Sequence, residues 1–284
     1  MTADRIRLGE FTVTGLRDGF FFLDGGAMFG VVPKTLWQRK CPADSQNRIK
    51  MGLNSMLVKT PSALVLVETG IGSKLDRKLS GIYCVERDPG LLGALAGLGF
   101  KPEDIDFVIN THLHFDHCGG NTVLDENGAA VPAFPRARYI IQKGEWEWAM
   151  NPHDRERGSY QPDNFRPLAD FGLLDLVDGD AEVTPGVDVR LAPGHTERHQ
   201  CVRVRSGGKT LVYLGDLVPT SAHIGLAYGM SYDLNPLENL ETKRKLYDQA
   251  ISEDWILAFV HDPVHYFGRV KKDNRKYAFA PLEE

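Results

Sequence analysis

The stretch of sequence that decides the fold is Thr111-His112-Leu113-His114-Phe115-Asp116-His117-Cys118-Gly119-Gly120. It places three imidazoles and one carboxylate within six residues, and at an overall usage of about 3% His such a cluster rarely arises by chance. Imidazole and carboxylate groups are the ligands that zinc, iron, manganese and nickel take in proteins. The stretch therefore predicts a metal site, and a polar loop with surface histidines is the alternative interpretation.

The position of this cluster favours a site for two metals. Residues 106–110 predict a strand with Phe107, Val108 and Ile109 at its centre, so the first ligands emerge from the end of a rigid element. His112 and His114 are two residues apart and can point to the same side, whereas Asp116 and His117 turn toward a neighbouring position. Four ligands offered in two pairs indicate two metal ions rather than one.

Apolar and alternating runs elsewhere predict further strands. The run at 63–67 is almost entirely apolar, as in a strand that is buried on both faces. The run at 255–260 is the last strand that we expect. The others cover residues 11–16, 20–23, 53–59, 137–142, 187–191, 201–204 and 211–214.

Helices are predicted over 91–98 and over 236–252. Strands come early in each half of the chain and helices follow, which predicts two sheets covered by helices on their outer faces. We expect a single domain over residues 1–284, with a polar and aromatic surface insert near 143–166 that forms a helix and a long loop. One face of the second helix carries Leu237, Leu240, Tyr247 and Ile251.

Composition excludes several classes of protein. With 284 residues, 42% hydrophobic and 25% charged, the chain is neither disordered nor fibrous. The net charge of -5 argues against a nucleic-acid partner, and no run is apolar enough for a membrane helix. Residues 1–7 carry charges where a signal peptide needs an apolar stretch, so we expect a cytoplasmic location. Four cysteines without a CxxC pair predict no disulfide framework.

The HxHxDH pattern of residues 112–117 resembles the signature of the metallo-β-lactamase superfamily. The resemblance implies an α/β fold, a four-layered αβ/βα sandwich, with the metals at one edge between two sheets. It extends from about residue 53 to residue 262. Three later stretches look like the remaining ligand positions of that family: Pro193-Gly194-His195-Thr196, Tyr213-Leu214-Gly215-Asp216 and Phe259-Val260-His261-Asp262.

The resemblance also implies which residue holds which metal. Two divalent ions are expected, zinc first, with iron, manganese or cobalt as alternatives. Taken alone, His195 and His261 could instead be a capping and a core histidine. Glu68 stands where the family usually has Asp, and is expected to accept a hydrogen bond from a ligand histidine unless it is a surface acid. The implied ligands are His112, His114 and His195 for one metal, Asp116, His117 and His261 for the other, and Asp216 as the bridge.

The other histidines and the nearest cysteine have less specific interpretations. His199 is expected at the surface, and His153 is expected to be solvated in a charged loop. His223 and His265 are candidates to reach the pocket. Cys118 is expected to face the core rather than to react.

Such a ligand set would keep a net positive charge and ionise a bridging water near neutral pH. The expected reaction is attack by a metal-bridging hydroxide on an ester or lactone carbonyl, with Asp116 as the catalytic residue that shuttles the proton. Zinc β-lactamases usually lack an aspartate at the position of Asp216, and glutathione thioesterases carry a helical region after the last ligand, where only 23 residues follow His261. The branch that the chain most resembles includes N-acyl-homoserine lactonases and methyl parathion hydrolase-like enzymes.

The substrate pocket is the least defined part of this prediction. The lactonases commonly place a tyrosine three residues after the bridging aspartate, where this chain has Pro219; Tyr228, Tyr232 or His223 could take its place. Residues 27–33 form an apolar loop that either overhangs the metals or packs in the core. Four aromatic residues could form a wall of the pocket or could fix the insert to the body: Trp146, Trp148, Tyr160 and Phe165.

We therefore expect a metal-dependent hydrolase of small-molecule lactones or carboxylic esters. Three alternatives stay open: a phosphotriester (organophosphate) hydrolase on the same site, a non-catalytic metal-binding module, and an iron oxidoreductase. A homodimer also stays open.

Overall fold

The computed structural model describes residues 5–274 and 276–282, and it contains two seven-stranded sheets. The charged N-terminal stretch that we single out covers residues 1–7, and its first four residues, Met1 to Asp4, lie outside the described residues. The first sheet has the order β1 (Arg5–Leu8), β2 (Phe11–Asp24), β3 (Arg48–Lys59), β4 (Leu64–Val67), β5 (Phe107–Ile109), β8 (Arg138–Gln142) and β9 (Leu174–Val177). The second has the order β10 (Ala181–Thr184), β11 (Val187–Leu191), β12 (Gln200–Ser206), β13 (Lys209–Tyr213), β14 (Ile256–Ala258), β15 (Phe267–Asp273) and β16 (Lys276–Pro281).

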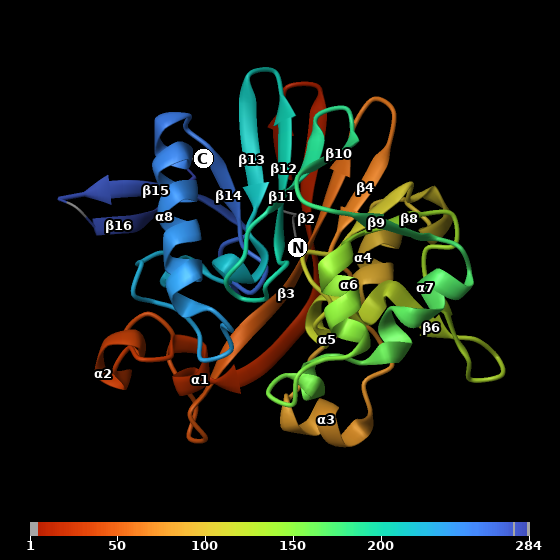
Figure 1. The fold of residues 1–284 in the computed structure, drawn as a ribbon, viewed down its shortest axis with the longest axis horizontal. Coiled ribbons are helices and arrows are strands. Elements are labelled where there is room, and N and C mark those ends of the chain that lie inside the picture. The colour runs from red at the N-terminus through yellow and green to blue at the C-terminus, as the bar shows by residue number, and fades with distance from the viewer. Residues whose placement is uncertain (1–4, 275, 283–284) are drawn as a thin grey trace.

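Helices cover the outer faces of the two sheets. In Figure 1, α8 lies on the left flank beside the second sheet, and α4 and α6 lie on the right beside the first sheet. A separate hairpin joins β6 (Thr122–Leu124) and β7 (Ala130–Pro132). The layers therefore confirm the α/β sandwich that the sequence predicts. The helices are α1 (Gly25–Phe29), α2 (Lys34–Trp37), α3 (Arg77–Ile82), α4 (Gly90–Gly97), α5 (Phe115–Cys118), α6 (Lys143–Met150), α7 (Arg166–Asp170) and α8 (Pro236–Ser252).

The alternation of side chains along central strands explains the layers. Val65 and Val67 of β4 point into the core between the two sheets, whereas Leu64 and Leu66 pack under the helices of the first sheet. All four are buried, as the apolar run predicts. In the second sheet Tyr213 of β13 faces the central core in the same way. Burial on both faces fixes the register of these strands, because a shift by one residue would exchange the two faces.

The strands of both sheets end at one edge, and this places the site. β4, β5 and β8 run parallel to one another, and so do β13 and β14. Carboxyl ends of parallel strands meet at the same edge of a sheet. Three of the ligand-bearing stretches follow such an end: residues 110–118 follow β5, residues 214–216 follow β13 and residues 259–262 follow β14. Residues 193–196 follow β11, which is antiparallel to its neighbours but runs in the same direction as β13, two strands away.

Three sequence-based expectations differ from the structure. Residues 11–16 and 20–23 belong to one strand, β2, because β3 pairs with its whole length. The strand at 255–260 is not the last, since β15 and β16 follow it. The buried stripe of α8 also differs, because this helix packs closely on Gly194, where a Cβ atom would lie 2.4 Å from Asn239 Cα. Leu237 is 81% exposed, and the buried residues are Asn239, Lys243, Tyr247 and Ala250.

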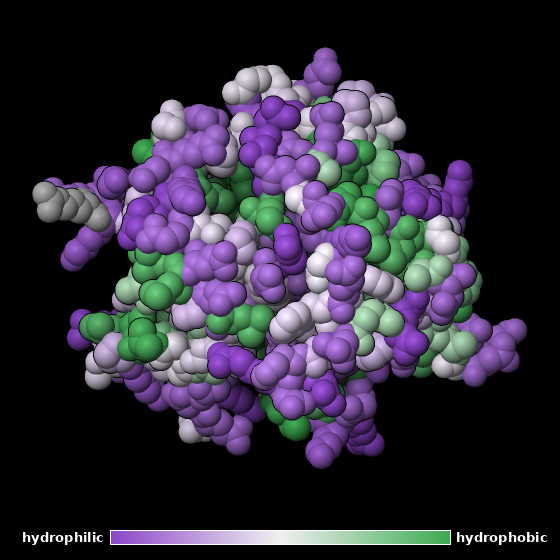
Figure 2. Space-filling view, viewed as in Figure 1, coloured by the Kyte–Doolittle hydropathy of each residue, from purple (hydrophilic) through white to green (hydrophobic). Residues whose placement is uncertain are grey.

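Within residues 5–274 and 276–282 no helix is long and apolar enough to cross a membrane. Figure 2 shows hydrophilic side chains over most of one face, with hydrophobic residues in small groups between them. The cytoplasmic location and the homodimer stay predictions.

A buried carboxylate fixes the turn behind the predicted ligand-bearing loop of residues 110–118. Asp18 of β2 is fully buried and accepts hydrogen bonds from the backbone N–H groups of Ile71 and Gly72, each at 3.1 Å, and of Leu91 at 2.8 Å. Arg87 also binds it, at 2.7 Å. Because Ile71 packs directly against Gly119, Asp18 supports the ligand-bearing loop from behind.

We expect Asp18→Ala to lower the free energy of unfolding by about 3–5 kcal/mol, because it leaves a half-buried guanidinium and three backbone donors without their acceptor. Chemical denaturation measures this loss. The matched control is Asp175→Ala, which removes an exposed ion pair with Arg138 and should cost less than about 1 kcal/mol. Equal losses in the two variants would contradict the supporting role of Asp18.

Candidate metal centre

The ligand-bearing loop after β5 is shaped by close backbone approaches. His114 precedes the short helix α5, and Asp116 and His117 lie within it, so they turn away from His112. Gly119 and Gly120 follow and pass directly beside the turn after β4. A Cβ atom on Gly119 would lie 2.1 Å from the carbonyl oxygen of Ile71. Only glycine fits there, which explains the Gly-Gly pair in the motif.

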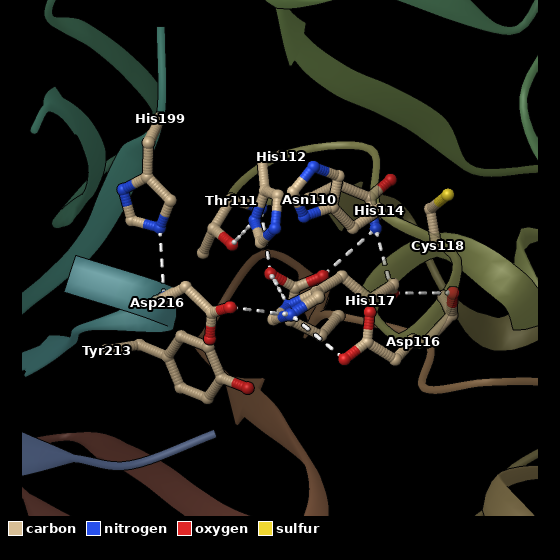
Figure 3. Close-up of polar contacts among 12 residues, drawn as sticks. Asn110, Thr111, His112, His114, Asp116, His117, Cys118, His199, Tyr213 and Asp216 are labelled. Carbon is tan, nitrogen blue, oxygen red and sulfur yellow. Dashed lines mark hydrogen bonds and ion pairs between the residues drawn. The ribbon is translucent and has the colours of Figure 1, made fainter. Parts of the chain in front are cut away.

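The structure brings six of the predicted ligand residues together in two groups of three, and the seventh, Asp216, lies between them. A further cluster of Glu68, His112 and His117 overlaps both groups. In the first group, His114 Nδ1 lies 3.2 Å from His195 Nε2. In the second group, His117 Nε2 lies 3.2 Å from His261 Nε2. Figure 3 shows the histidines of the loop converging with Asp116 and Asp216. Within each group the potential ligand atoms lie within 4.8 Å of one another: His112, His114 and His195 in the first, Asp116, His117 and His261 in the second.

Asp216 lies between the two groups. Its Oδ2 atom is 3.3 Å from His195 Nε2 in the first group, and its Oδ1 atom is 3.2 Å from His261 Nε2 in the second. Burial alone would raise the pKa of Asp216, but the neighbouring imidazoles of His117, His261 and His195 hold that pKa well below its usual value. The carboxylate is therefore ionised and spans both groups.

Each of the five histidines has its second ring nitrogen next to an oxygen atom. Three of these contacts are hydrogen bonds and hold the orientation of their rings, whereas the buried His117 Nδ1 and His114 Nε2 atoms face carboxylates without a hydrogen bond among the described residues. The pairs are His112 Nδ1 with Thr111 Oγ1 (3.0 Å), His195 Nδ1 with Asp233 Oδ1 (3.1 Å), His261 Nδ1 with Gly52 O (2.8 Å), His117 Nδ1 with Glu68 Oε1 (3.5 Å) and His114 Nε2 with Glu156 Oε2 (3.6 Å).

This donor set fits divalent metal ions. His112 Nε2 and Asp216 Oδ1 are buried and have no hydrogen-bond partner among the described residues, although buried polar atoms are normally paired. Burial, and then the neighbouring His117, His114 and His195, lower the pKa of His112 well below its usual value, so this imidazole is neutral, as a metal ligand must be. Nitrogen and carboxylate ligands without a thiolate suit zinc, iron, manganese or cobalt.

Glu68 is buried behind this centre rather than exposed at the surface. It is 1% exposed and has a positive φ of 60° at the end of β4. Its Oε1 atom accepts a hydrogen bond from the backbone N–H of Thr111 at 2.8 Å and also approaches His117. Asn110 donates to its Oε2 atom at 3.3 Å. Glu68 therefore holds the start of the ligand-bearing loop in addition to facing a predicted ligand.

The prediction for His199 is wrong, because this residue is fully buried. Its Nδ1–H donates to the carbonyl of Ala192 at 3.2 Å, and its Nε2 accepts from the backbone N–H of Asp216 at 3.1 Å (Figure 3). Burial lowers the pKa of His199 to about 3, so the ring stays neutral. His199 thus fixes the backbone of the spanning aspartate. Its position directly before an apolar strand was the available sequence signal.

A cavity of about 290 Å³ opens onto the centre. Its apolar wall includes Met28, so residues 27–33 contribute to the pocket, although 27–29 are helical rather than a loop. Tyr232 lines the cavity, whereas Tyr228 and His223 are not among its described lining residues. The polar wall carries Tyr83, Arg155 and Glu156 in addition to the predicted ligands.

The aromatic residues of the insert fix it to the body. Tyr160 and Phe165 are buried in the core beneath the first sheet, and Trp146 packs edge-on to Phe165 with ring centroids 5.7 Å apart. Trp146, Trp148, Tyr160 and Phe165 are absent from the described lining of the cavity. Cys118 belongs to the same core and donates to the carbonyl of Leu113, as expected for an inert thiol.

Neither of the two histidines proposed to reach the pocket does so. His223 donates from Nε2 to the carbonyl of Met28 at 2.8 Å, accepts at Nδ1 from Thr220 at 2.7 Å and stacks on Phe29. His265 packs against Phe279 instead. His153 is exposed, as predicted.

A protein-family match agrees with this arrangement of residues. The family described as the metallo-beta-lactamase superfamily matches residues 50–261, well over half of the chain. An N-acyl homoserine lactonase of Bacillus cereus is 28% identical over 178 residues, which are 59% of this chain and 64% of that protein. The lactonase AttM of Rhizobium radiobacter is 27% identical over 63% of this chain and 66% of its own length. The chain thus matches less than two thirds of the length of these curated relatives.

Solved structures are similar over nearly the whole chain. A probable metal-dependent hydrolase from Staphylococcus aureus has a TM-score of 0.89 and 29% identity, over 98% of this chain and 99% of its own. AidC, described as a dizinc quorum-quenching lactonase, has a TM-score of 0.83 and 23% identity, over 99% of this chain and 98% of its own. At that identity the second likeness shows the fold alone.

The buried His223 predicts a pH-dependent loss of stability. Burial, and then the charge of Lys243, lower its pKa from 6.5 to about 4. Between these values the unfolded chain binds a proton that the folded chain does not, so this contribution is complete above pH 6.5 and is lost as the pH falls to 4. The loss amounts to about 3 kcal/mol. Urea unfolding at pH 7 and pH 4.5 should show that His223→Gln loses less stability on acidification than the wild type, whereas the exposed control His153→Gln behaves like the wild type. Parallel profiles for all three proteins would contradict this prediction.

Proposed function

The chain belongs to the metallo-beta-lactamase superfamily, and we propose that it hydrolyses lactones and carboxylic esters with two bound metal ions. The single observation that carries the proposal is the position of Asp216, whose carboxylate lies between two groups of buried imidazoles at the base of a largely apolar cavity.

We assign each ligand by the group in which its atoms lie. His112, His114 and His195 would hold the first ion, and Asp116, His117 and His261 the second, with Asp216 shared. The nitrogen and oxygen donors support zinc as the metal. When bound, the two ions lower the pKa of a coordinated water and polarise a carbonyl oxygen.

The protein's own residues complete the reaction. Asp116 lines the cavity and its Oδ2 atom lies 3.4 Å from His261 Nε2, so its carboxylate reaches both the centre and a substrate. We propose that it receives the proton of the attacking water and returns it to the leaving alkoxide. Met28, Phe21 and Met230 present apolar surface to the rest of the substrate. Such a wall favours neutral acyl compounds over highly charged ones.

The relatives support the same substrate class. Those named N-acyl homoserine lactonase act, by that name, on a ring ester with an acyl chain. The cavity over the centre suits a compound of that kind, with the ester next to Asp116 and the apolar chain along the wall.

A panel of substrates tests the proposal. We expect kcat/KM to be highest for an acyl-homoserine lactone or an aryl carboxylic ester, and lower for a paraoxon-type triester, a cephalosporin and an acyl-glutathione. The chelator-treated protein should be inactive, and about two equivalents of zinc should restore activity. A cephalosporin or a thioester at the head of the series would reject the substrate class, and undiminished activity without metal would reject the mechanism.

Asp116→Asn should lower kcat by about 10²–10⁴-fold, because the amide cannot carry the proton to the leaving group. The measurement is made at saturating metal, and elemental analysis of the same sample shows whether the ions are retained. A variant that keeps two metals and the wild-type kcat would show that the proton takes another route.

A further inference from the structure

The segment 143–166, expected from the sequence to be a surface insert, places a buried carboxylate between two ligand-bearing loops. Glu145 of α6 is 1% exposed. Its Oε1 atom accepts a hydrogen bond from the backbone N–H of Leu113 at 3.0 Å, and its Oε2 atom accepts one from the hydroxyl of Thr196 at 2.7 Å. Leu113 lies between His112 and His114, and Thr196 follows His195. One carboxylate therefore joins the two loops that carry the first ligand group.

A second carboxylate of the same segment faces a ligand directly. Glu156 is 7% exposed, and the indole N–H of Trp148 donates to its Oε1 atom. Its Oε2 atom lies 3.6 Å from His114 Nε2, and neither of these two buried atoms has a hydrogen-bond partner among the described residues. The ring of Tyr160 packs edge-on to His114, with centroids 4.8 Å apart. The segment thus surrounds the outer side of His114.

The second ligand group receives its support from elsewhere. Glu68, at the end of β4, faces His117 Nδ1, and the carbonyl of Gly52 in β3 accepts from His261 Nδ1 at 2.8 Å. Gly52 belongs to the first sheet, and Glu68 directly follows one of its strands, β4. Among the described residues, the polar contacts of segment 143–166 with ligand-bearing loops are those of Glu145 and Glu156, and the residues contacted are His114 of the first group and two direct neighbours of that group's ligands, Leu113 and Thr196.

Core packing does not account for these two acids. Tyr160 and Phe165 are enough to anchor the segment in the core, and burial of a carboxylate is unfavourable unless it is paired. Within the segment, Tyr160 donates to Glu145 and Trp148 donates to Glu156. The other partners of the two acids are the backbone N–H of Leu113, the hydroxyl of Thr196 and the imidazole of His114, all in or next to the first ligand group. A carboxylate behind a ligating histidine fixes its tautomer and increases its basicity. For His114 this leaves the Nδ1 lone pair directed at the centre, 3.2 Å from His195 Nε2.

We propose that segment 143–166 is a clamp for the first metal ion, in which Glu156 orients His114 and Glu145 sets the spacing between the loops of His114 and His195. Both acids are positioning residues. The inference rests on the two-metal site of the proposed function but not on its substrate. It means that the affinities of the two metal sites are set by different parts of the fold.

The test isolates each metal site in turn. His261→Ala disables the second site and leaves the first, and His195→Ala does the reverse. We expect Glu156→Gln to weaken Zn²⁺ binding by about 10–100-fold in the His261→Ala background and to leave it unchanged in the His195→Ala background. Competition with a chromophoric chelator measures the affinity directly, without an activity assay.

Three further variants complete the experiment. Glu147→Gln is the matched control, because Glu147 lies in the same segment with its side chain 63% exposed, and it should change neither affinity. Glu68→Gln should weaken the second site more than the first, because Glu68 faces His117 and also accepts the backbone N–H of Thr111, next to His112. Trp148→Phe removes the indole donor while keeping Glu156, and it should also weaken the first site. This variant carries the test if Glu156→Gln does not fold.

The outcomes separate this inference from the proposed function. Equal losses in both backgrounds, or no loss in either, would overturn the clamp while leaving a two-metal hydrolase intact. A wild-type protein that binds fewer than two Zn²⁺ ions would instead reject the proposed function itself.

Discussion

Ring nitrogen atoms of several histidines lie close together in a buried space, and the surrounding structure holds them there. Two pairs of imidazole nitrogens face one another at 3.2 Å, one pair in each ligand group, with the Asp216 carboxylate between them. Lone pairs so close repel unless a proton or a cation lies between them, so flexible loops would separate them. The fold resists this because the ligands follow the ends of strands, most of which are buried on both faces. The sandwich architecture is therefore the means by which the centre is held together.

The hydrogen bonds on the outer side of the predicted ligands come from both sheets. The outward nitrogen of His261 binds the carbonyl of Gly52 in the first sheet, although His261 itself follows a strand of the second. The backbone of Asp216 in turn is fixed by His199, which precedes β12. Pro219 adds a further link, since its carbonyl accepts the backbone N–H of His261 at 2.9 Å. The centre is therefore cross-linked between sheets as well as within them, and a shift of one sheet would displace ligands of both groups.

What the sequence could predict was local. Spacing within six residues identified the ligand-bearing loop, and apolar runs located the strands that precede His195, Asp216 and His261. Glu156 and Asp233 were missed because nothing in their local sequence marks a carboxylate that folds back onto a histidine tens of residues away. The exposed Leu237 was misplaced for a related reason: helical periodicity alone cannot show that α8 approaches Gly194 so closely that polar residues occupy the contact. His199 was misassigned because burial beside another loop is a tertiary property.

The walls of the cavity, rather than the metal centre, are the part of the molecule that can distinguish substrates. The side chains of the seven predicted ligands have little freedom to move, because each follows the end of a strand and most are held by a second contact. The wall is built instead from separate loops: Met28 from α1, Tyr83 after α3, and Tyr232 from the segment before α8. Pro219 offers no side-chain donor at the position where a lactonase tyrosine is expected. Any hydrogen bond from a tyrosine to the substrate must then come from these loops, of which Tyr232 is 40% exposed and Tyr83 partly buried. Because loops change without disturbing the strands, one centre of this kind can serve different esters while its ligand geometry stays the same.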